Sequence, residues 1–158
     1  MIYHLPKLWF DSQLEELVEH PMNLRLVLVN GCFDILHVGH VDYLETARTK
    51  GDLMLVLLNS DRSVRMLKGP RRPINPELWR ARVLAALECV SAIFIFEEPT
   101  VADWLSRIQP YVWCKSSPYT MDTLHPDEVA AAKEAGTKIE IIPVKFPIST
   151  TEILNREL

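Results

Sequence analysis

The chain has 158 residues, of which 48% are hydrophobic and 24% charged, as is typical of one soluble domain with its own core. Its formal charge of -4 argues against non-specific binding to nucleic acid, which needs a basic surface. No apolar run approaches the roughly 20 residues of a membrane span, and the three cysteines without a CxxC pair indicate neither a zinc site nor a disulfide framework. We therefore expect a cytoplasmic, single-domain protein over residues 1–158 that binds neither membranes nor nucleic acid.

The first segment, residues 1–23, contains a short amphipathic stretch. Ser12 has the side chain of a helix cap, and Glu15 lies three residues later, where it can complete a capping box. We predict a short leading helix that lies on the domain.

The segment over residues 30–40, NGCFDILHVGH, stands between two regular elements. An apolar, β-branched run over residues 24–29 precedes it and predicts a strand, and apolar positions at helical spacing follow it over residues 41–48. His37 and His40 flank Gly39 where this helix begins, so two imidazoles and free backbone N–H groups can face one anion. The first functional hypothesis is therefore a phosphate site.

The rest of the chain continues to alternate between strands and helices. Further strands are predicted over residues 53–58, 92–96, 111–114 and 138–142, and helices over residues 76–88, 101–108, 127–135 and from 150 onward. Residues 59–61 are expected to form a turn, and residues 68–76 a basic loop. This alternation predicts an α/β fold with a Rossmann-like parallel sheet of about five strands and helices on both faces.

Several polar residues follow predicted strands. Ligands of such sheets bind beyond the carboxyl ends of the strands, where the strand order reverses. His37, His40, residues 59–61 and Lys115 all lie just past a predicted strand, so we expect them to meet at one site. The chain contains neither GxGxxG nor GxxxxGK[ST], so this site is not a dinucleotide fingerprint or a Walker loop.

Two motifs resemble the signatures of the cytidylyltransferase-like nucleotidyltransferases. The first is GCFD at residues 31–34 with HVGH at residues 37–40, and the second is ISTT at residues 148–151. Residues 30–40 and 119–126 are most similar to the adenylyltransferase domain that makes ADP-heptose from heptose 1-phosphate. The resemblance covers nearly the whole chain.

The resemblance implies transfer of a nucleoside monophosphate, AMP rather than CMP, from a nucleoside triphosphate to a sugar phosphate such as heptose 1-phosphate, with release of pyrophosphate. It also implies Mg²⁺ bound with the triphosphate, although no residues form a dedicated metal site, and a homodimer. The catalytic residues would be His37, His40 and Lys115. The nucleotide-binding residues would be Gly31, Cys32, Phe33, Asp34, Gly39, Asn59, Asp61, Lys68, Arg72, Arg80, Ser149, Thr150 and Thr151. Among these, Asp34 would help to position ligand or metal, and Lys68, Arg72 and Arg80 would supply mobile positive charge.

The sequence departs from the heptose-type pattern after the fourth predicted strand. Residues 115–119 are KSSPY where the family has Lys-Gly-Gly-Asp-Tyr, and Pro147 stands where the family has a glycine. One alternative is a cytidylyltransferase acting on glycerol 3-phosphate or another small phosphorylated alcohol. Residues 144–151, however, lack the arginine and glutamate of the Arg-Thr-Glu-Gly-Ile-Ser-Thr-Thr motif of the glycerol-phosphate enzyme. Another alternative is a nucleotide-binding module without turnover.

Simpler structural roles also fit some of these residues. A helix cap would by itself account for the hydroxyl residues at 149–151. Cys32 is interpreted as a small residue under the turn rather than a nucleophile. Trp79, Trp104 and Trp113 are expected in or near the core.

Overall fold

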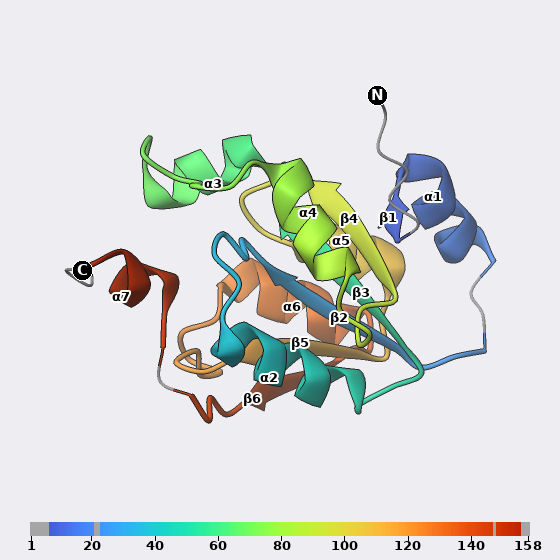
Figure 1. Ribbon diagram of the computed structural model, residues 1–158. Helices are drawn as coiled ribbons and strands as arrows, with labels where there is room; N and C mark the ends of the chain where they lie inside the picture. Colours follow the sequence, from blue (N-terminus) through green and yellow to red (C-terminus); the bar gives the residue numbers. More distant parts are fainter. Residues whose placement is uncertain (1–6, 21–22, 147, 156–158) are drawn as a thin grey trace.

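The computed structural model describes residues 7–20, 23–146 and 148–155 (Figure 1). In this part of the chain, six parallel strands form one sheet in the order β1-β4-β3-β2-β5-β6. The strands are β1 (Leu8–Trp9), β2 (Leu26–Gly31), β3 (Leu53–Asn59), β4 (Ala92–Phe96), β5 (Val112–Ser116) and β6 (Lys138–Ile142). The helices are α1 (Asp11–Glu19), α2 (Val38–Arg48), α3 (Asp61–Lys68), α4 (Glu77–Ala85), α5 (Ala102–Ile108), α6 (Pro126–Glu134) and α7 (Thr150–Leu154).

The sheet separates two hydrophobic clusters, because successive side chains of a strand point to opposite faces. Val27 and Val29 of β2 pack with residues of α2 and α4, whereas Leu28 packs with residues of α1, α5 and α6. Figure 1 shows α2 and α4 in front of the sheet, with α5 and α6 behind it. The Rossmann-like α/β fold with helices on both faces is confirmed.

The strand order reverses at β2. From this strand the chain builds outward to β3 and β4 on one side, and then returns to place β5 and β6 on the other. The crevice beyond the carboxyl ends of β2 and β5 is therefore the topological switch point at which open α/β sheets bind ligands. The segment HVGH, at residues 37–40 between β2 and α2, lies at this crevice.

Two elements were not predicted. β1 has only two residues, Leu8 and Trp9, which pair with Ile93 and Phe94 of β4, so it is too short to show periodicity. α3 begins where a turn was expected, because Ser60 caps it by accepting a hydrogen bond from the backbone N–H of Ser63 at 3.1 Å. Its eight residues, DRSVRMLK, include three apolar side chains, of which Val64 is buried whereas Met66 and Leu67 are exposed.

The leading helix is present, but its predicted cap is wrong. α1 starts after Phe10, and the side chain Oε1 of Gln13 accepts a hydrogen bond from the Phe10 N–H at 2.9 Å. Ser12 therefore lies inside the first turn. Residues 1–6 and 21–22 of the predicted leading segment lie outside the described residues.

The tryptophans divide between core and surface. Trp104 and Trp113 are buried as predicted, but Trp79 is 66% exposed, so its predicted place near the core is wrong. The reason is the orientation of α4, which turns Ala81 and Leu84 toward the sheet instead. Within the described ranges, no helix is both long enough and apolar enough to cross a membrane.

Candidate active site

A cavity of about 640 Å³ lies at the carboxyl ends of β2, β3 and β5. It collects residues from both sequence motifs, from the basic loop and from the segment after β5. Of the predicted site residues, all line this cavity except Asp61 and Arg80. The fold therefore brings together groups that are more than one hundred residues apart in the chain.

Two stacked imidazoles form one wall of the cavity. The ring centroids of His37 and His40 lie 3.8 Å apart with 20° between the ring planes, and Phe33 contacts His40 edge-on at 5.2 Å. His37 is the N-cap of α2, and its Nδ1 accepts a hydrogen bond from the His40 N–H at 3.4 Å. A Cβ on Gly39 would lie 3.1 Å from the His37 ring and 3.3 Å from the Phe146 carbonyl oxygen. Glycine at this position therefore lets the ring pack against the turn.

Both imidazoles favour the neutral form. Burial and, to a lesser extent, neighbouring His37 together lower the pKa of His40 to about 4, against a smaller opposing effect of the Ile35 backbone. Burial also lowers the pKa of His37. The buried Nδ1 of His40 makes no hydrogen bond with any described residue. At neutral pH the pair can thus offer N–H groups to an anion without carrying two positive charges side by side.

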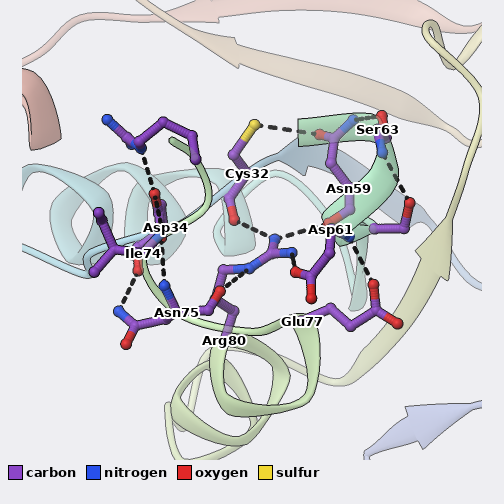
Figure 2. Close-up of polar contacts among 11 residues, drawn as sticks. Cys32, Asp34, Asn59, Asp61, Ser63, Ile74, Asn75, Glu77 and Arg80 are labelled. Carbon is purple, nitrogen blue, oxygen red and sulfur yellow. Dashed lines mark hydrogen bonds and ion pairs between the residues drawn. The ribbon is translucent and has the colours of Figure 1, made fainter. Parts of the chain in front are cut away.

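Asp34 holds the basic loop, as Figure 2 shows. Its carboxylate accepts hydrogen bonds from Arg72 Nε at 2.6 Å and from the backbone N–H groups of Ile74 and Asn75 at 2.8 and 2.9 Å. Burial alone would raise the pKa of Asp34, but these hydrogen bonds and Arg72 outweigh it, so the pKa is lowered. This carboxylate therefore anchors the loop. Asp34 also lines the cavity, so its expected role in positioning ligand or metal stays a prediction.

Arg80 is buried and forms hydrogen bonds with residues of several elements, so it is not a mobile charge (Figure 2). Only 2% of this residue is exposed, and its guanidinium donates to the carbonyl oxygens of Cys32, Asn59 and Asn75 at 2.7 to 2.9 Å. It also donates to Asp61 Oδ1 at 2.8 Å. The predicted mobile role of Arg80 is therefore wrong. Neither Arg80 nor Asp61 lines the cavity described above.

The second motif reaches the first at the start of α7. Ser149 caps this helix by accepting a hydrogen bond from the Glu152 N–H at 3.1 Å, as the simpler structural role requires. The hydroxyl of Thr150 contacts the Ile35 carbonyl oxygen at 3.4 Å, which joins α7 to the segment between β2 and α2. Ser149, Thr150 and Thr151 also line the cavity, so capping does not exclude contact with a ligand. Pro147 lies outside the described residues.

Three cationic side chains line the cavity: Lys68, Arg72 and Lys115. Lys115 is only 8% exposed, and its Nζ lies 3.4 Å from Asn30 Oδ1 and 4.6 Å from the centre of the Tyr119 ring. Burial lowers the pKa of Lys115, although Glu128 acts in the opposite direction. Lys115 therefore lies in a site with little solvent.

Sequence reasoning missed several residues of this cavity. Glu128, in the first turn of α6, lines the cavity together with Thr100, Thr123 and His125. Glu128 is 7% exposed and accepts a hydrogen bond from the Val101 N–H at 3.0 Å. The sequence around it predicted only an alanine-rich helix, and no motif distinguishes this carboxylate from the others in that helix.

The described residues that line the cavity do not form a metal-binding cage. Among the residues that the structure describes, no group of three or more His, Cys, Asp or Glu side chains is placed to hold a metal ion. A magnesium ion, which prefers several oxygen ligands and retains waters, would find most of its ligands on the phosphates of a bound nucleotide.

Comparison with known sequences identifies a family over the part of the chain that forms the cavity. The model of the family described as "Cytidylyltransferase-like" matches residues 28–156. The chain is 48% identical over 132 residues to the bifunctional protein HldE of Methylobacillus flagellatus, covering 84% of this chain and 27% of that protein. It is 47% identical over 132 residues to the protein of the same name from Geotalea uraniireducens, covering 84% of this chain and 26% of the relative. The chain thus spans about a quarter of the length of these curated relatives.

Solved structures share the fold. A lipopolysaccharide core biosynthesis protein from Thermoplasma volcanium superposes with a TM-score of 0.63 at 22% identity, covering 78% of this chain and 98% of that one. A pantoate-beta-alanine ligase from Francisella tularensis superposes with a TM-score of 0.57 at 15% identity, covering 90% of this chain and 73% of that one. At this level of identity the likeness is one of fold.

Proposed function

This chain belongs to the cytidylyltransferase-like family, and on that premise we propose that it transfers AMP from ATP to a sugar phosphate such as heptose 1-phosphate, releasing pyrophosphate. The observation that carries the proposal is the single cavity that the histidine pair, the basic loop and the hydroxyls of residues 149–151 all line. The resemblance of residues 30–40 to the domain that makes ADP-heptose supports the choice of acceptor, as does the likeness to the HldE proteins.

The reaction suits a site without a strong base. A phosphate oxygen of the acceptor attacks the α-phosphorus of the triphosphate in line, a new P–O bond forms, and the bond to the bridging oxygen breaks as pyrophosphate leaves. The attacking phosphate is already ionised at neutral pH, so no proton has to be removed. Catalysis then consists of orienting two anions and stabilising the charge that develops between them.

Each group in the cavity has a role in this scheme. The neutral N–H groups of His37 and His40 would donate to the α-phosphate, and well-placed donors of this kind contribute on the order of several kcal/mol in a dry site. The hydroxyls of residues 149–151 would bind the departing phosphates, and Lys68 and Arg72 would offset their charge. Lys115 lies at the end of β5 and would contact the acceptor.

Mg²⁺ belongs to this proposal as the companion of the triphosphate. When bound, it would neutralise phosphate charge, held chiefly by phosphate oxygens and water.

We further propose that the protein acts as a homodimer, for which light scattering would give twice the 18.2 kDa mass of the chain.

Pyrophosphate release tests the proposal directly. The protein would be mixed with ATP or CTP, and with heptose 1-phosphate or glycerol 3-phosphate, in all four pairs. We expect release with ATP and heptose 1-phosphate. Release only with CTP and glycerol 3-phosphate would contradict the proposal, and nucleotide binding without release for any acceptor would favour a non-catalytic module.

A further inference from the structure

Two buried residues of opposite charge, Lys115 and Glu128, line the same cavity, and no ion pair joins them in the described part of the chain. Lys115 of β5 is 8% exposed and Glu128 of α6 is 7% exposed, and both line the cavity. In the described part of the chain, the ammonium group of Lys115 has one hydrogen bond, to Asn30 at 3.4 Å. The carboxylate of Glu128 likewise has one, from the Val101 N–H at 3.0 Å.

Both groups retain unused hydrogen-bonding capacity. An ammonium has three N–H donors, and a carboxylate has two oxygens that accept several hydrogen bonds. Charged groups that are withdrawn from water without full compensation are costly. Both residues line the cavity, so a ligand bound there can complete their unused donors and acceptors.

The opposite signs of the two charges restrict the chemistry of that ligand. A phosphate would be attracted by Lys115 but repelled by Glu128, and other parts of the cavity already offer neutral or cationic groups to phosphates. A hydroxyl group can accept a hydrogen bond from an ammonium and donate one to a carboxylate. The ring of Tyr119, 4.6 Å from Lys115 Nζ, adds an apolar surface suited to the C–H face of a sugar.

We propose that Lys115 and Glu128 together bind hydroxyl groups of the acceptor sugar, and that Glu128 is a residue that determines acceptor specificity. This inference rests on the proposed function. It assigns the sugar hydroxyls to the end of the cavity between β5 and α6, and the triphosphate to the end at α2 and α7.

A purely structural role for Glu128 has to be separated from this one. Its Oε1 receives the N–H of Val101, immediately before α5, so removing the side chain would also disturb that helix. The substitution Glu128→Gln keeps a side-chain oxygen for Val101 while removing the negative charge and replacing the other oxygen by a donor. Glu134→Gln, on the exposed end of the same helix, is the matched control.

The first measurement is steady-state pyrophosphate release with ATP and heptose 1-phosphate. We expect Glu128→Gln to raise KM for the sugar phosphate at least tenfold while KM for ATP changes less than twofold, and Glu134→Gln to behave as the unchanged protein. An unchanged KM for the sugar phosphate, or an equal rise in both KM values, would overturn the inference and leave the proposed function standing. Absence of turnover in the unchanged protein with every sugar phosphate would instead overturn the proposed function, and this inference with it.

A second measurement uses heptose 1-phosphate analogues that each lack one hydroxyl. If Glu128 binds a hydroxyl, removal of that group should lower kcat/KM at least tenfold in the unchanged protein and by a clearly smaller factor in Glu128→Gln, where only the contact with Lys115 remains to be lost. A structural role predicts instead that every analogue loses the same factor in both proteins. That pattern would refute direct contact between Glu128 and the sugar.

Discussion

At the scale of single residues, the neutral state of His40 has a consequence for stability. Its pKa is about 4 in the folded protein, lowered mainly by burial, whereas an unfolded histidine titrates near 6.5. Between these values the unfolded chain binds more protons than the folded one, so the free energy of unfolding falls as the pH falls from about 6.5 toward 4. Above about pH 6.5 this contribution is fully present.

We predict that His40→Gln removes part of this pH dependence. Between pH 7 and pH 4.5 the substituted protein should lose roughly 2 kcal/mol less stability than the unchanged one, because glutamine does not titrate. Urea unfolding at a series of pH values measures the difference. Parallel curves for the two proteins would mean that His40 is not held neutral in the fold.

A second prediction at this scale concerns Asp34. Asp34→Asn keeps the size of the side chain but weakens the hydrogen bonds to Arg72 and to the backbone of residues 74 and 75, so it should destabilise the fold by about 1–3 kcal/mol. With the loop released, Arg72 loses its fixed direction, and KM for ATP should rise. Urea unfolding and pyrophosphate release measure the two effects.

The control for Asp34 is Asp42→Asn. Asp42 pairs with Lys145 at 2.9 Å, but the Lys145 side chain is 65% exposed, and such pairs contribute about 1 kcal/mol or less. If Asp34→Asn and Asp42→Asn lower the free energy of unfolding equally, the hydrogen bonds of Asp34 to the loop stabilise the fold no more than this ion pair does.

At the scale of elements, Arg80 connects the ends of β2 and β3 with α3 and α4 (Figure 2). Lysine keeps the charge but cannot present the planar set of donors that reaches three carbonyl oxygens and Asp61 together. We predict that Arg80→Lys destabilises the fold by about 3 kcal/mol, as expected when a buried ionic network is broken. It should also increase amide exchange in α3, because Asp61 begins that helix.

Arg82→Lys is the matched control, since Arg82 lies two residues further along α4 and is exposed. Thermal unfolding and hydrogen exchange followed by mass spectrometry compare the two proteins. Exchange in α3 that is equal in both would show that Arg80 does not hold this helix.

The elements also show what the sequence can and cannot reveal. β4 has the predicted bounds, because a buried parallel strand is a compact apolar run between clear boundaries. The edge strand β6 also has the predicted bounds, although only Ile142 of its residues is buried. α3 escaped detection because its stability comes from the Ser60 cap and from the contacts of Asp61 with neighbouring elements, rather than from an apolar stripe. Such contacts with distant residues leave no periodic pattern.

At the scale of the whole molecule, the site was predictable where a residue follows a strand. The topology of a parallel sheet places His37, Lys115 and Asn59 at one edge without further information. It does not say whether a charged side chain faces the cavity or the protein. Arg72 and Arg80 lie eight residues apart, yet one lines the cavity and the other is wholly enclosed, because the chain turns around Asp34 between them.

The arrangement of the whole cavity predicts which segments a nucleotide stabilises. α7 has five residues and none of them is buried, so in the free protein its amides should exchange rapidly. A triphosphate bound between the histidine pair and residues 149–151 would join α7 to the sheet. We therefore predict that a non-hydrolysable ATP analogue slows exchange at least tenfold in α7 and in residues 68–75, and leaves the buried strand β3 unchanged. Hydrogen exchange with and without the analogue measures this, and protection absent from α7 would place the triphosphate elsewhere in the cavity.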